Sequence, residues 1–226
     1  MQASIIWQIS VFIVPLFLSI ILHEMAHGWV AYKCGDKTAK LAGRLTLNPL
    51  SHIDPVGSVI VPTLLLLSKS GFMFGWAKPV PVNFSALHDE KKDMGLVALA
   101  GPFLNFILAL FASILLVVFM PDEFKGLSML QIWLLGSLRA FQVINLSLCA
   151  FNLFPVLPLD GGRILVSILP KEASQLYAQT ERYGFIVLLS LLFFFPMLGI
   201  DILSDYMLWI RQGLMEIIDF ILKGVS

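Results

Sequence analysis

Long apolar stretches alternate with short polar loops along the chain. Residues 1–22 carry no charged side chain, and no basic segment precedes the first stretch, so we expect a retained helix rather than a cleaved signal peptide. At 1.5 Å per residue, the ~29 residues of 4–32 would extend about 43 Å, more than the ~30 Å hydrocarbon core of a bilayer. Pro15 is a tolerated kink in such a helix. Further apolar stretches lie at 56–67, 94–120, 127–157, 185–200 and 202–222.

Two of these stretches do not fit an ordinary membrane span. The segment 56–67 has about 12 residues, which is too short for a spanning helix, and Pro62 lies in its middle. It predicts a re-entrant or interfacial segment. The segment 202–222 carries charges every few turns, so it is either a weak span or an amphipathic helix at the interface.

The pattern predicts an all-α polytopic membrane protein with about 4–6 membrane segments, including the short re-entrant or interfacial one. Glycines and prolines at 71–84 disfavour helix there, so a small extended or β region is expected near 72–83. We expect a single membrane-embedded domain, 1–226, with a catalytic core of about 4–182 and C-terminal helices at 183–226.

Composition excludes several classes of protein. The chain is 58% hydrophobic and 13% charged, against about 25% charge in soluble domains, so an ordinary soluble enzyme, a disordered chain and a fibrous protein are ruled out. Fifteen basic residues balance fifteen acidic ones, which leaves no basic excess to bind nucleic acid. The two cysteines do not suggest a disulfide framework.

Three ionisable side chains lie inside the first apolar stretch, where the bilayer makes them costly. His23 and His27 are four residues apart, so they share one helix face and can bind one metal ion. Glu24 follows the first histidine and could take a proton from the attacking water. The alternative is a helix whose histidines only hydrogen-bond to neighbouring side chains.

A catalytic zinc usually has three protein ligands, so one more is needed. Asp160 lies in a sequence with two prolines before it and two glycines after it, a break in a membrane helix that is tolerated only where it is buried or lines a cavity. Asp160 could be the third ligand or the N-cap of a helix that follows. His88 lies in a charged run and is most simply a solvated loop residue. The role of His52 stays open between orienting a ligand, contacting substrate and capping a loop.

Several polar residues share one face of the predicted helix at 127–157. Gln142, Asn145, Cys149 and Asn152 follow one another at steps of three, four and three, which places them in one row. Such amides commonly join membrane helices by hydrogen bonds, and we favour that interpretation for Gln142 and Asn145.

Four motifs together resemble the site-2 protease family of intramembrane zinc metalloproteases. They are HEMAH at 23–27, AGPFLN at 100–105, NLFPVLPLDGG at 152–162, and the string at 44–57 with GWAKPVPVN at 75–83. The strings at 44–57 and 75–83 are similar to those of a compact prokaryotic subgroup of the family. We therefore expect a member without a PDZ domain. The resemblance is limited to about residues 20–163.

The resemblance implies a site and a reaction. It places one Zn²⁺ per chain on His23, His27 and Asp160, makes Glu24 the general base, and makes Asn152 an amide that orients substrate or stabilises the oxyanion. The implied activity is hydrolysis of peptide bonds in or next to transmembrane segments of membrane-protein substrates. A non-enzymatic transporter or metal carrier using the same broken-helix site is the alternative, and a catalytically silent scaffold is disfavoured by Glu24.

Orientation follows from two arguments. His23 and Asp160 can meet only if the chain between Lys33 and Met94 crosses the membrane an even number of times. The Lys/Arg-rich loops, with four, four and three basic residues, then share one side, and Lys125 lies alone on the other. The positive-inside rule makes the first side cytoplasmic. We therefore expect a multi-pass protein of the cell membrane whose active site lies towards the cytoplasm.

Overall fold

The structure is a computed structural model that describes residues 5–67, 75–121 and 126–224. Its α-helices are α1 (Ile5–Lys33), α2 (Thr38–Leu41), α3 (Val61–Leu67), α4 (Glu90–Phe119), α5 (Met129–Asn152), α6 (Asp160–Ile168), α7 (Lys171–Ala178), α8 (Glu181–Leu189), α9 (Phe195–Met197) and α10 (Ile202–Lys223). Short 3-10 turns lie at Pro49–His52 and Phe84–Ala86, and π-helical turns lie at Pro55–Ile60 and Ser190–Phe194.

Within these residues, three helices are long and apolar enough to cross a membrane, and a bent pair could be a fourth span. The three segments are Ile9–Lys33, Glu90–Phe119 and Met129–Asn152, and the pair joins Lys171–Ala178 to Glu181–Met197 across a 57° bend. The protein is therefore an all-α, multi-pass membrane protein, as predicted, with a count of spans at the low end of the expected range.

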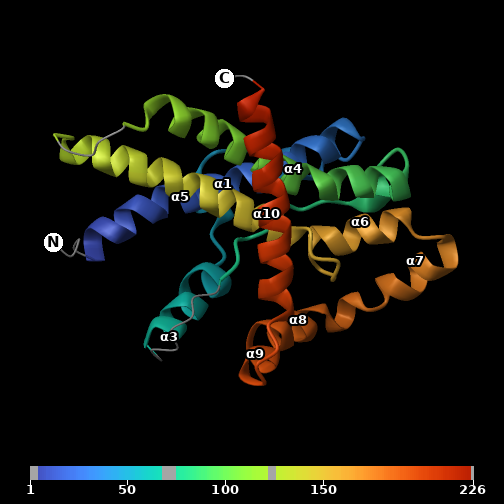
Figure 1. The fold of residues 1–226 in the computed structure, drawn as a ribbon. Helices are drawn as coiled ribbons and strands as arrows, with labels where there is room; N and C mark the ends of the chain where they lie inside the picture. Colours follow the sequence, from blue (N-terminus) through green and yellow to red (C-terminus); the bar gives the residue numbers. More distant parts are fainter. Residues whose placement is uncertain (1–4, 68–74, 122–125, 225–226) are drawn as a thin grey trace.

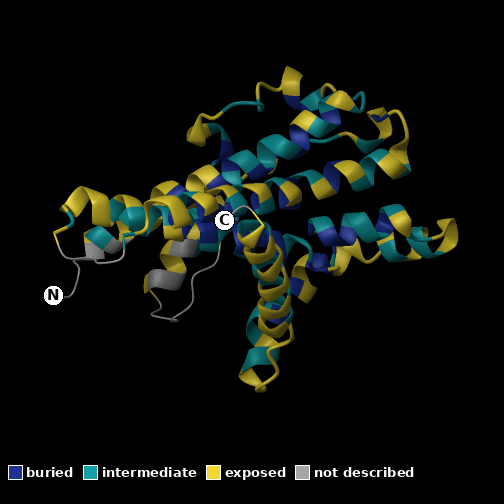
Figure 2. Ribbon diagram, turned by 45° about the horizontal axis from the view of Figure 1, so that its top comes forward, coloured by how far each residue is buried: buried dark blue, intermediate teal, exposed yellow. Residues whose placement is uncertain are grey.

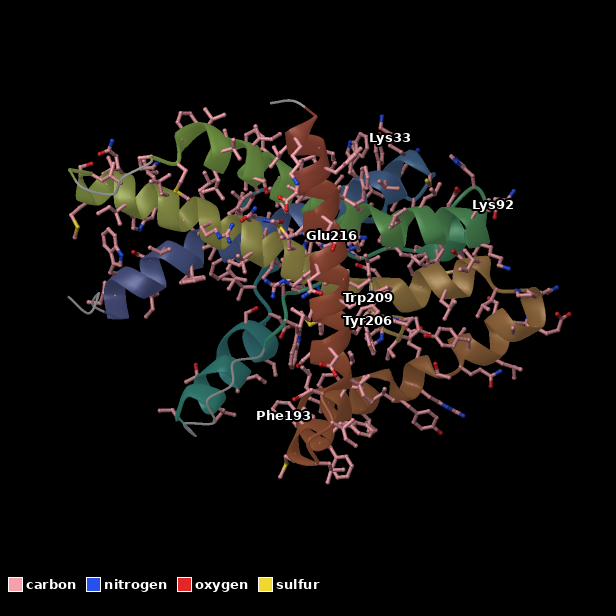
Figure 3. The ribbon with its side chains drawn as sticks, in the orientation of Figure 1. Lys33, Lys92, Phe193, Tyr206, Trp209 and Glu216 are labelled. Atoms are coloured by element: carbon pink, nitrogen blue, oxygen red, sulfur yellow. The ribbon has the colours of Figure 1, made fainter. Side chains whose placement is uncertain are left out.

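The spans α1, α4 and α5 pack side by side and form the body of the molecule (Figure 1). Lys33 ends α1 and Lys92 lies in the first turn of α4, and both lie at the same end of the bundle (Figure 3). The chain between them therefore makes no net crossing. The turn at Pro55–Ile60 and α3 point from the middle of the bundle towards the end where α1 begins, as a short re-entrant segment would.

The predicted β region does not form a strand within the residues that the structure describes. Residues 75–83 are extended but unpaired with any strand, and Phe72 to Phe74 lie outside the described part. Backbone N–H groups of this segment donate instead to helical turns, from Trp76 to the Gly57 carbonyl at 3.1 Å and from Lys78 to the His52 carbonyl at 2.9 Å. Pro79 and Pro81 have no N–H to give to a ladder, which explains the absence of one.

Helix α10 runs across the spans α4 and α5 instead of alongside them (Figure 1). Ile218 of α10 is fully buried against Ala109 of α4 and Leu146 of α5. Its charged residues keep it out of the set of candidate spans. The segment at 202–222 is thus an amphipathic helix packed on the bundle.

Exposed residues lie along the outer faces of the spans (Figure 2), and many of them are large and apolar. Phe12 of α1, Phe103 and Phe111 of α4, and Leu134 of α5 are each more than half exposed. In water such a surface would aggregate, but facing lipid tails it costs nothing. Small and polar residues fill the interior between the helices instead, as is usual for membrane bundles.

Buried polar contacts hold the loops at the site end of the bundle. The carboxylate of Asp36, 1% exposed, accepts hydrogen bonds from the backbone N–H groups of Thr38 at 2.8 Å and Asn83 at 2.7 Å. His52, 3% exposed, has its Nε2 atom 2.9 Å from the Thr46 carbonyl. Among the roles left open for His52, this contact with a backbone carbonyl of its own loop fits the loop cap, whereas His88 is exposed as expected.

Candidate metal centre and active site

His23 and His27 face one another from successive turns of α1. Their Nε2 atoms are 2.9 Å apart, and the two residues are 6% and 9% exposed. The Nδ1 atom of each ring lies next to an oxygen acceptor. Nδ1 of His27 lies 2.7 Å from the Val97 carbonyl, and Nδ1 of His23 lies 2.5 Å from Oδ1 of Asn105. Oxygen acceptors on both Nδ1 atoms favour the tautomer in which both Nε2 lone pairs are free.

Asp160 completes this group from a different part of the chain. Its Oδ2 atom lies 3.3 Å from Nε2 of His23 and 3.3 Å from Nε2 of His27. Asp160 is the first residue of α6, and the N-cap is Leu159, without a side-chain cap hydrogen bond. The side chain of Asp160 therefore does not serve as the helix cap that the sequence left open.

The three side chains fit a metal ion. Their ligand atoms all lie within 4.8 Å of one another, and no other group of three His, Cys, Asp or Glu residues does so in the described part of the chain. Oδ2 of Asp160 is buried and has no hydrogen-bond partner. Two histidine nitrogens and a carboxylate oxygen that converge in a buried site are suited to hold a cation between them. Two His ligands with one carboxylate are a recurrent catalytic zinc set.

A glycine of α4 makes room for the two imidazole rings. A Cβ atom built on Gly101 would lie 2.5 Å from Cε1 and 2.6 Å from Nε2 of His23, and it would also clash with the ring of His27. Real Cβ contacts essentially never come this close. Gly101 therefore lets α4 approach α1 at the level of the metal ligands.

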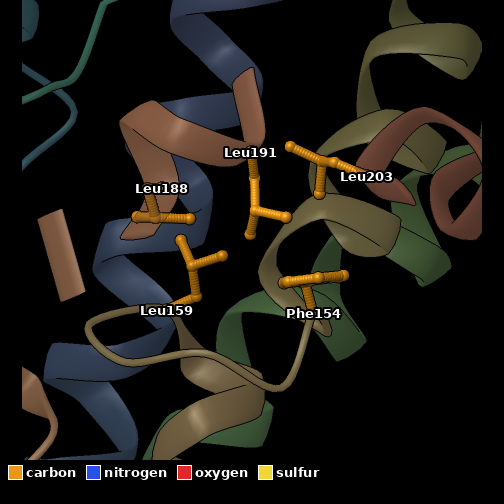
Figure 4. Close-up of a cluster of buried hydrophobic side chains, with 5 residues drawn as sticks. All are labelled: Phe154, Leu159, Leu188, Leu191 and Leu203. Carbon is orange, nitrogen blue, oxygen red and sulfur yellow. The ribbon is translucent and has the colours of Figure 1, made fainter. Parts of the chain in front are cut away.

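The loop between α5 and α6 carries Asp160 to the histidines. Gly161 and Gly162 pack directly on this loop, and a Cβ atom at Gly162 would lie 2.5 Å from the Leu157 nitrogen. A leucine-rich cluster fixes the loop from the other side. Phe154 and Leu159 of the loop are buried among Leu188, Leu191 and Leu203 of the C-terminal part (Figure 4).

Glu24 lines a cavity next to the metal ligands. Its Oε2 atom accepts a 2.8 Å hydrogen bond from the backbone N–H of Val80. The cavity has a volume of about 750 Å³ and lies between helices α1, α4, α5, α6 and α8 and the segment 75–84. Trp76 and Phe185 meet edge to face across it, with ring centroids 5.9 Å apart.

Asn152 lines the same cavity at the end of α5. Its Nδ2 atom donates to the Leu148 carbonyl of its own helix at 3.0 Å. Gln142 and Asn145, on the same helix face, lie deeper and donate to or accept from side chains of neighbouring helices. Their expected role in joining helices is confirmed.

The structure also brings in residues that the sequence did not assign to the site. Asn105 and Gly101 both belong to the AGPFLN motif at 100–105, which predicts a family resemblance but no contact with the metal ligands. The signal available in the sequence was a small residue followed four positions later by an amide in an apolar helix. Without the pairing of α1 with α4, that pattern does not indicate contact with His23.

Comparison with known proteins gives the family. The model of Peptidase family M50 matches residues 11–131 and 124–195, which include every residue of the candidate site. The chain belongs to peptidase family M50. The expected resemblance to site-2 proteases is thereby confirmed.

Several curated relatives of this M50 chain agree with the family. YwhC of Bacillus subtilis (strain 168) is 42% identical over 200 residues, covering 87% of this chain and 83% of YwhC. Zinc metalloprotease MJ0392 of Methanocaldococcus jannaschii is 30% identical over 174 residues, 76% of this chain and 38% of MJ0392. The regulator of sigma-E protease RseP of Salmonella typhimurium is 31% identical over 113 residues, 48% and 25% of the two chains. No solved structure matches the chain.

These findings define the class of this M50 protein. It is an enzyme, a zinc metallopeptidase of the intramembrane type, embedded by several apolar helices. The alternative of a non-enzymatic transporter or metal carrier is not supported.

Proposed function

We propose that His23, His27 and Asp160 hold one zinc ion per chain, and that the enzyme hydrolyses peptide bonds in or beside transmembrane segments of other membrane proteins. The observation that carries this proposal is the convergence of three ligand atoms within 4.8 Å, with Oδ2 of Asp160 buried and unpaired. The apolar surface of the spans gives the enzyme access to substrates in the bilayer.

Glu24 is the proposed general base. Zinc at this site supplies a Lewis acid that polarises the scissile carbonyl and acidifies the attacking water. Glu24 lies one residue after a ligand and in the same cavity, where its carboxylate can take the proton from water and pass it to the leaving amine. The N–H of Val80 holds one oxygen of Glu24, which leaves the other for the proton.

Asn152 is the proposed contact for the substrate backbone. Its amide lines the cavity from the end of α5, beside the break that carries Asp160. One Nδ2 hydrogen is used within the helix, and the second can donate to a carbonyl or oxyanion in the cavity. A cavity of about 750 Å³ has room for a short unwound stretch of substrate but not for an intact helix, which is about 10–12 Å wide with its side chains.

The active site is proposed to lie towards the cytoplasm. Four basic residues lie in the last turn of α1 or in the loop after it, at the end of the bundle nearest the site: Lys33, Lys37, Lys40 and Arg44. After α4, Lys125 is the single basic residue before α5 begins. Single cysteines at exposed Lys37 and Met120, in a variant lacking Cys34 and Cys149, distinguish the two sides. In intact cells an impermeant thiol reagent should label position 120 and leave position 37 unlabelled until the membrane is opened.

The decisive experiment for function pairs metal analysis with cleavage. The purified protein should contain one zinc per chain and should cleave at least one member of a panel of single-span membrane proteins. Chelation of the metal should stop cleavage, and added zinc should restore it. Cleavage that continues in metal-free protein would contradict the proposed function.

A further inference from the structure

A chain of buried side chains runs from His23 into the interior, away from the cavity. Oδ1 of Asn105 lies 2.5 Å from Nδ1 of His23, and Nδ2 of Asn105 donates to Oδ1 of Asn145 at 2.7 Å. Nδ2 of Asn145 donates to Oγ of Ser19 at 2.8 Å and to the Phe141 carbonyl at 2.8 Å. Asn105, Asn145 and Ser19 are each 0% exposed.

The direction of every hydrogen bond in this chain is fixed from its far end. The Phe141 carbonyl can only accept, so Asn145 must turn its Nδ2 group towards it and its Oδ1 atom towards Asn105. An amide oxygen also only accepts, so Asn105 must present Nδ2 to Asn145. That leaves the oxygen of Asn105 facing the imidazole of His23.

We propose that Asn105 and Asn145 form a positioning relay that fixes the proton of His23 on Nδ1 and so leaves Nε2 for the metal. The inference rests on the proposed metal site. Asn105 acts on the metal only through His23, and Asn145 acts only through Asn105. The terminal support is a main-chain carbonyl, which cannot rotate or change its hydrogen-bonding character.

In this proposal a backbone carbonyl orients each of the two histidines, directly for His27 and through two side-chain amides for His23. His27 meets a backbone carbonyl directly, at Val97. His23 meets one through two amides, ending at Phe141. The relay also joins three spans, because His23 and Ser19 belong to α1, Asn105 to α4 and Asn145 to α5. Partners that orient a metal-binding histidine are typically worth about 10–100-fold in metal affinity.

The tautomer of His23 tests the relay without any metal. Protein labelled with ¹⁵N in its histidine rings and stripped with chelator should give Nδ1-protonated signals for His23 and His27, assigned by loss of one signal in His23→Ala. In Asn105→Leu the His23 signal should move to the Nε2-protonated or mixed form, while the His27 signal stays. If Asn105→Leu is not recovered from membranes, Asn145→Leu should shift the same signal.

Zinc affinity, measured by competition with a chelator, provides the second measurement. Asn105→Leu should bind zinc about 10–100-fold more weakly, and Asn105→Asp, which keeps the oxygen acceptor for His23 but loses the donor to Asn145, should recover part of the loss. Gln142→Leu is the matched control, because Gln142 is 3% exposed on the same helix as Asn145 and bonds to Ser113 outside the relay. Its zinc affinity should stay at the wild-type value.

A double variant separates the relay from general packing. Because both residues act along one path, Asn105→Leu combined with Asn145→Leu should bind zinc no more weakly than Asn105→Leu alone. An unchanged His23 tautomer in Asn105→Leu, or an equal loss of zinc in Gln142→Leu, would overturn the relay. Absence of zinc from the wild-type protein would instead refute the metal site, and the tautomer spectra would still decide the relay.

Discussion

The backbone N–H of Val80 donates a 2.8 Å hydrogen bond to Oε2 of Glu24, which lies 56 residues earlier in the chain. Val80 is flanked by Pro79 and Pro81, whose rings restrict φ and stiffen the extended segment. The carboxylate proposed as general base is thus oriented by a main-chain group rather than by a charged side chain.

Replacement of Glu24 by Gln should abolish turnover and leave the metal in place. The amide oxygen of Gln can still accept the Val80 hydrogen bond, so the extended segment keeps its position. General acid–base help is worth about 10²–10⁴-fold, and cleavage should fall by at least that factor, measured on a single-span substrate. Zinc content is the control and should not change. A wild-type cleavage rate would refute the role of Glu24.

Replacement of Asp160 by Ala should remove the metal. The histidines alone leave a two-ligand site, whereas catalytic zinc usually has three protein ligands. The loss should exceed the ~10–100-fold expected for a residue that only orients a ligand. Asp205→Ala, an exposed carboxylate in the first turn of α10, is the matched control. Full zinc occupancy in Asp160→Ala would exclude Asp160 from the site.

Replacement of Gly101 by Ala should damage the metal site through shape alone. The added methyl group would lie 2.5 Å from Cε1 of His23, so the rings or the helices must move apart. Such overpacking costs about 1–3 kcal/mol, and zinc affinity should fall by tenfold or more. Gly213→Ala in α10, where the new Cβ meets nothing within 4 Å, should bind zinc normally and gain slightly in thermal stability.

Replacement of Asn152 by Ala should slow cleavage and keep zinc. One donor to a developing oxyanion is worth about 10²–10³ in rate, well above the effect of removing a half-buried amide from a helix end. The rate is to be measured at saturating substrate, with zinc content and thermal stability in parallel. A normal rate together with a lower melting temperature would make Asn152 a helix-packing residue instead.

Replacement of Asp36 by Asn should loosen the loops at the site end. Burial raises the pKa of Asp36, but hydrogen bonds from Thr38 and Asn83 outweigh this and lower it below its usual value. A lowered folded-state pKa stabilises the fold above the unfolded value of ~3.9, and this stability is lost as pH falls through the folded pKa. Asp36→Asn should cost about 1–3 kcal/mol at neutral pH in thermal unfolding, and less in acid. Asp201→Asn, without a cap hydrogen bond, should cost little.

Local pattern was sufficient for the spans and for most of the proposed site. Uninterrupted apolar stretches predict α1, α4 and α5 because a lipid-exposed backbone must satisfy its own hydrogen bonds. The spacing of His23 and His27 and the helix break at Asp160 are likewise local features. The short segment at 56–67 was set apart from the spans by its length and by Pro62, and the structure has no candidate span in its described residues.

Features that depend on pairing between distant segments could not be predicted. The extended segment 75–83 has the composition of a strand, but no neighbouring strand is present among the described residues, and it bonds to helical turns instead. The contact of Asn105 with His23 requires the register of α4 against α1, which no periodicity within either helix contains. The path of α10 across the bundle depends on its packing on Ala109 and Leu146.

The loop that carries Asp160 packs on three leucines that come later in the chain, Leu188, Leu191 and Leu203. The loop can therefore reach its final packing only after these residues have been synthesised. Chains are made from the N-terminus at about 5–20 residues per second, so the histidines enter the membrane long before the residues that brace Asp160. Until Leu203 has been made, the cluster around Phe154 and Leu159 is incomplete, and the loop that carries Asp160 lacks part of its support. The candidate site is therefore expected to form only once the start of α10 packs on the loop that carries Asp160.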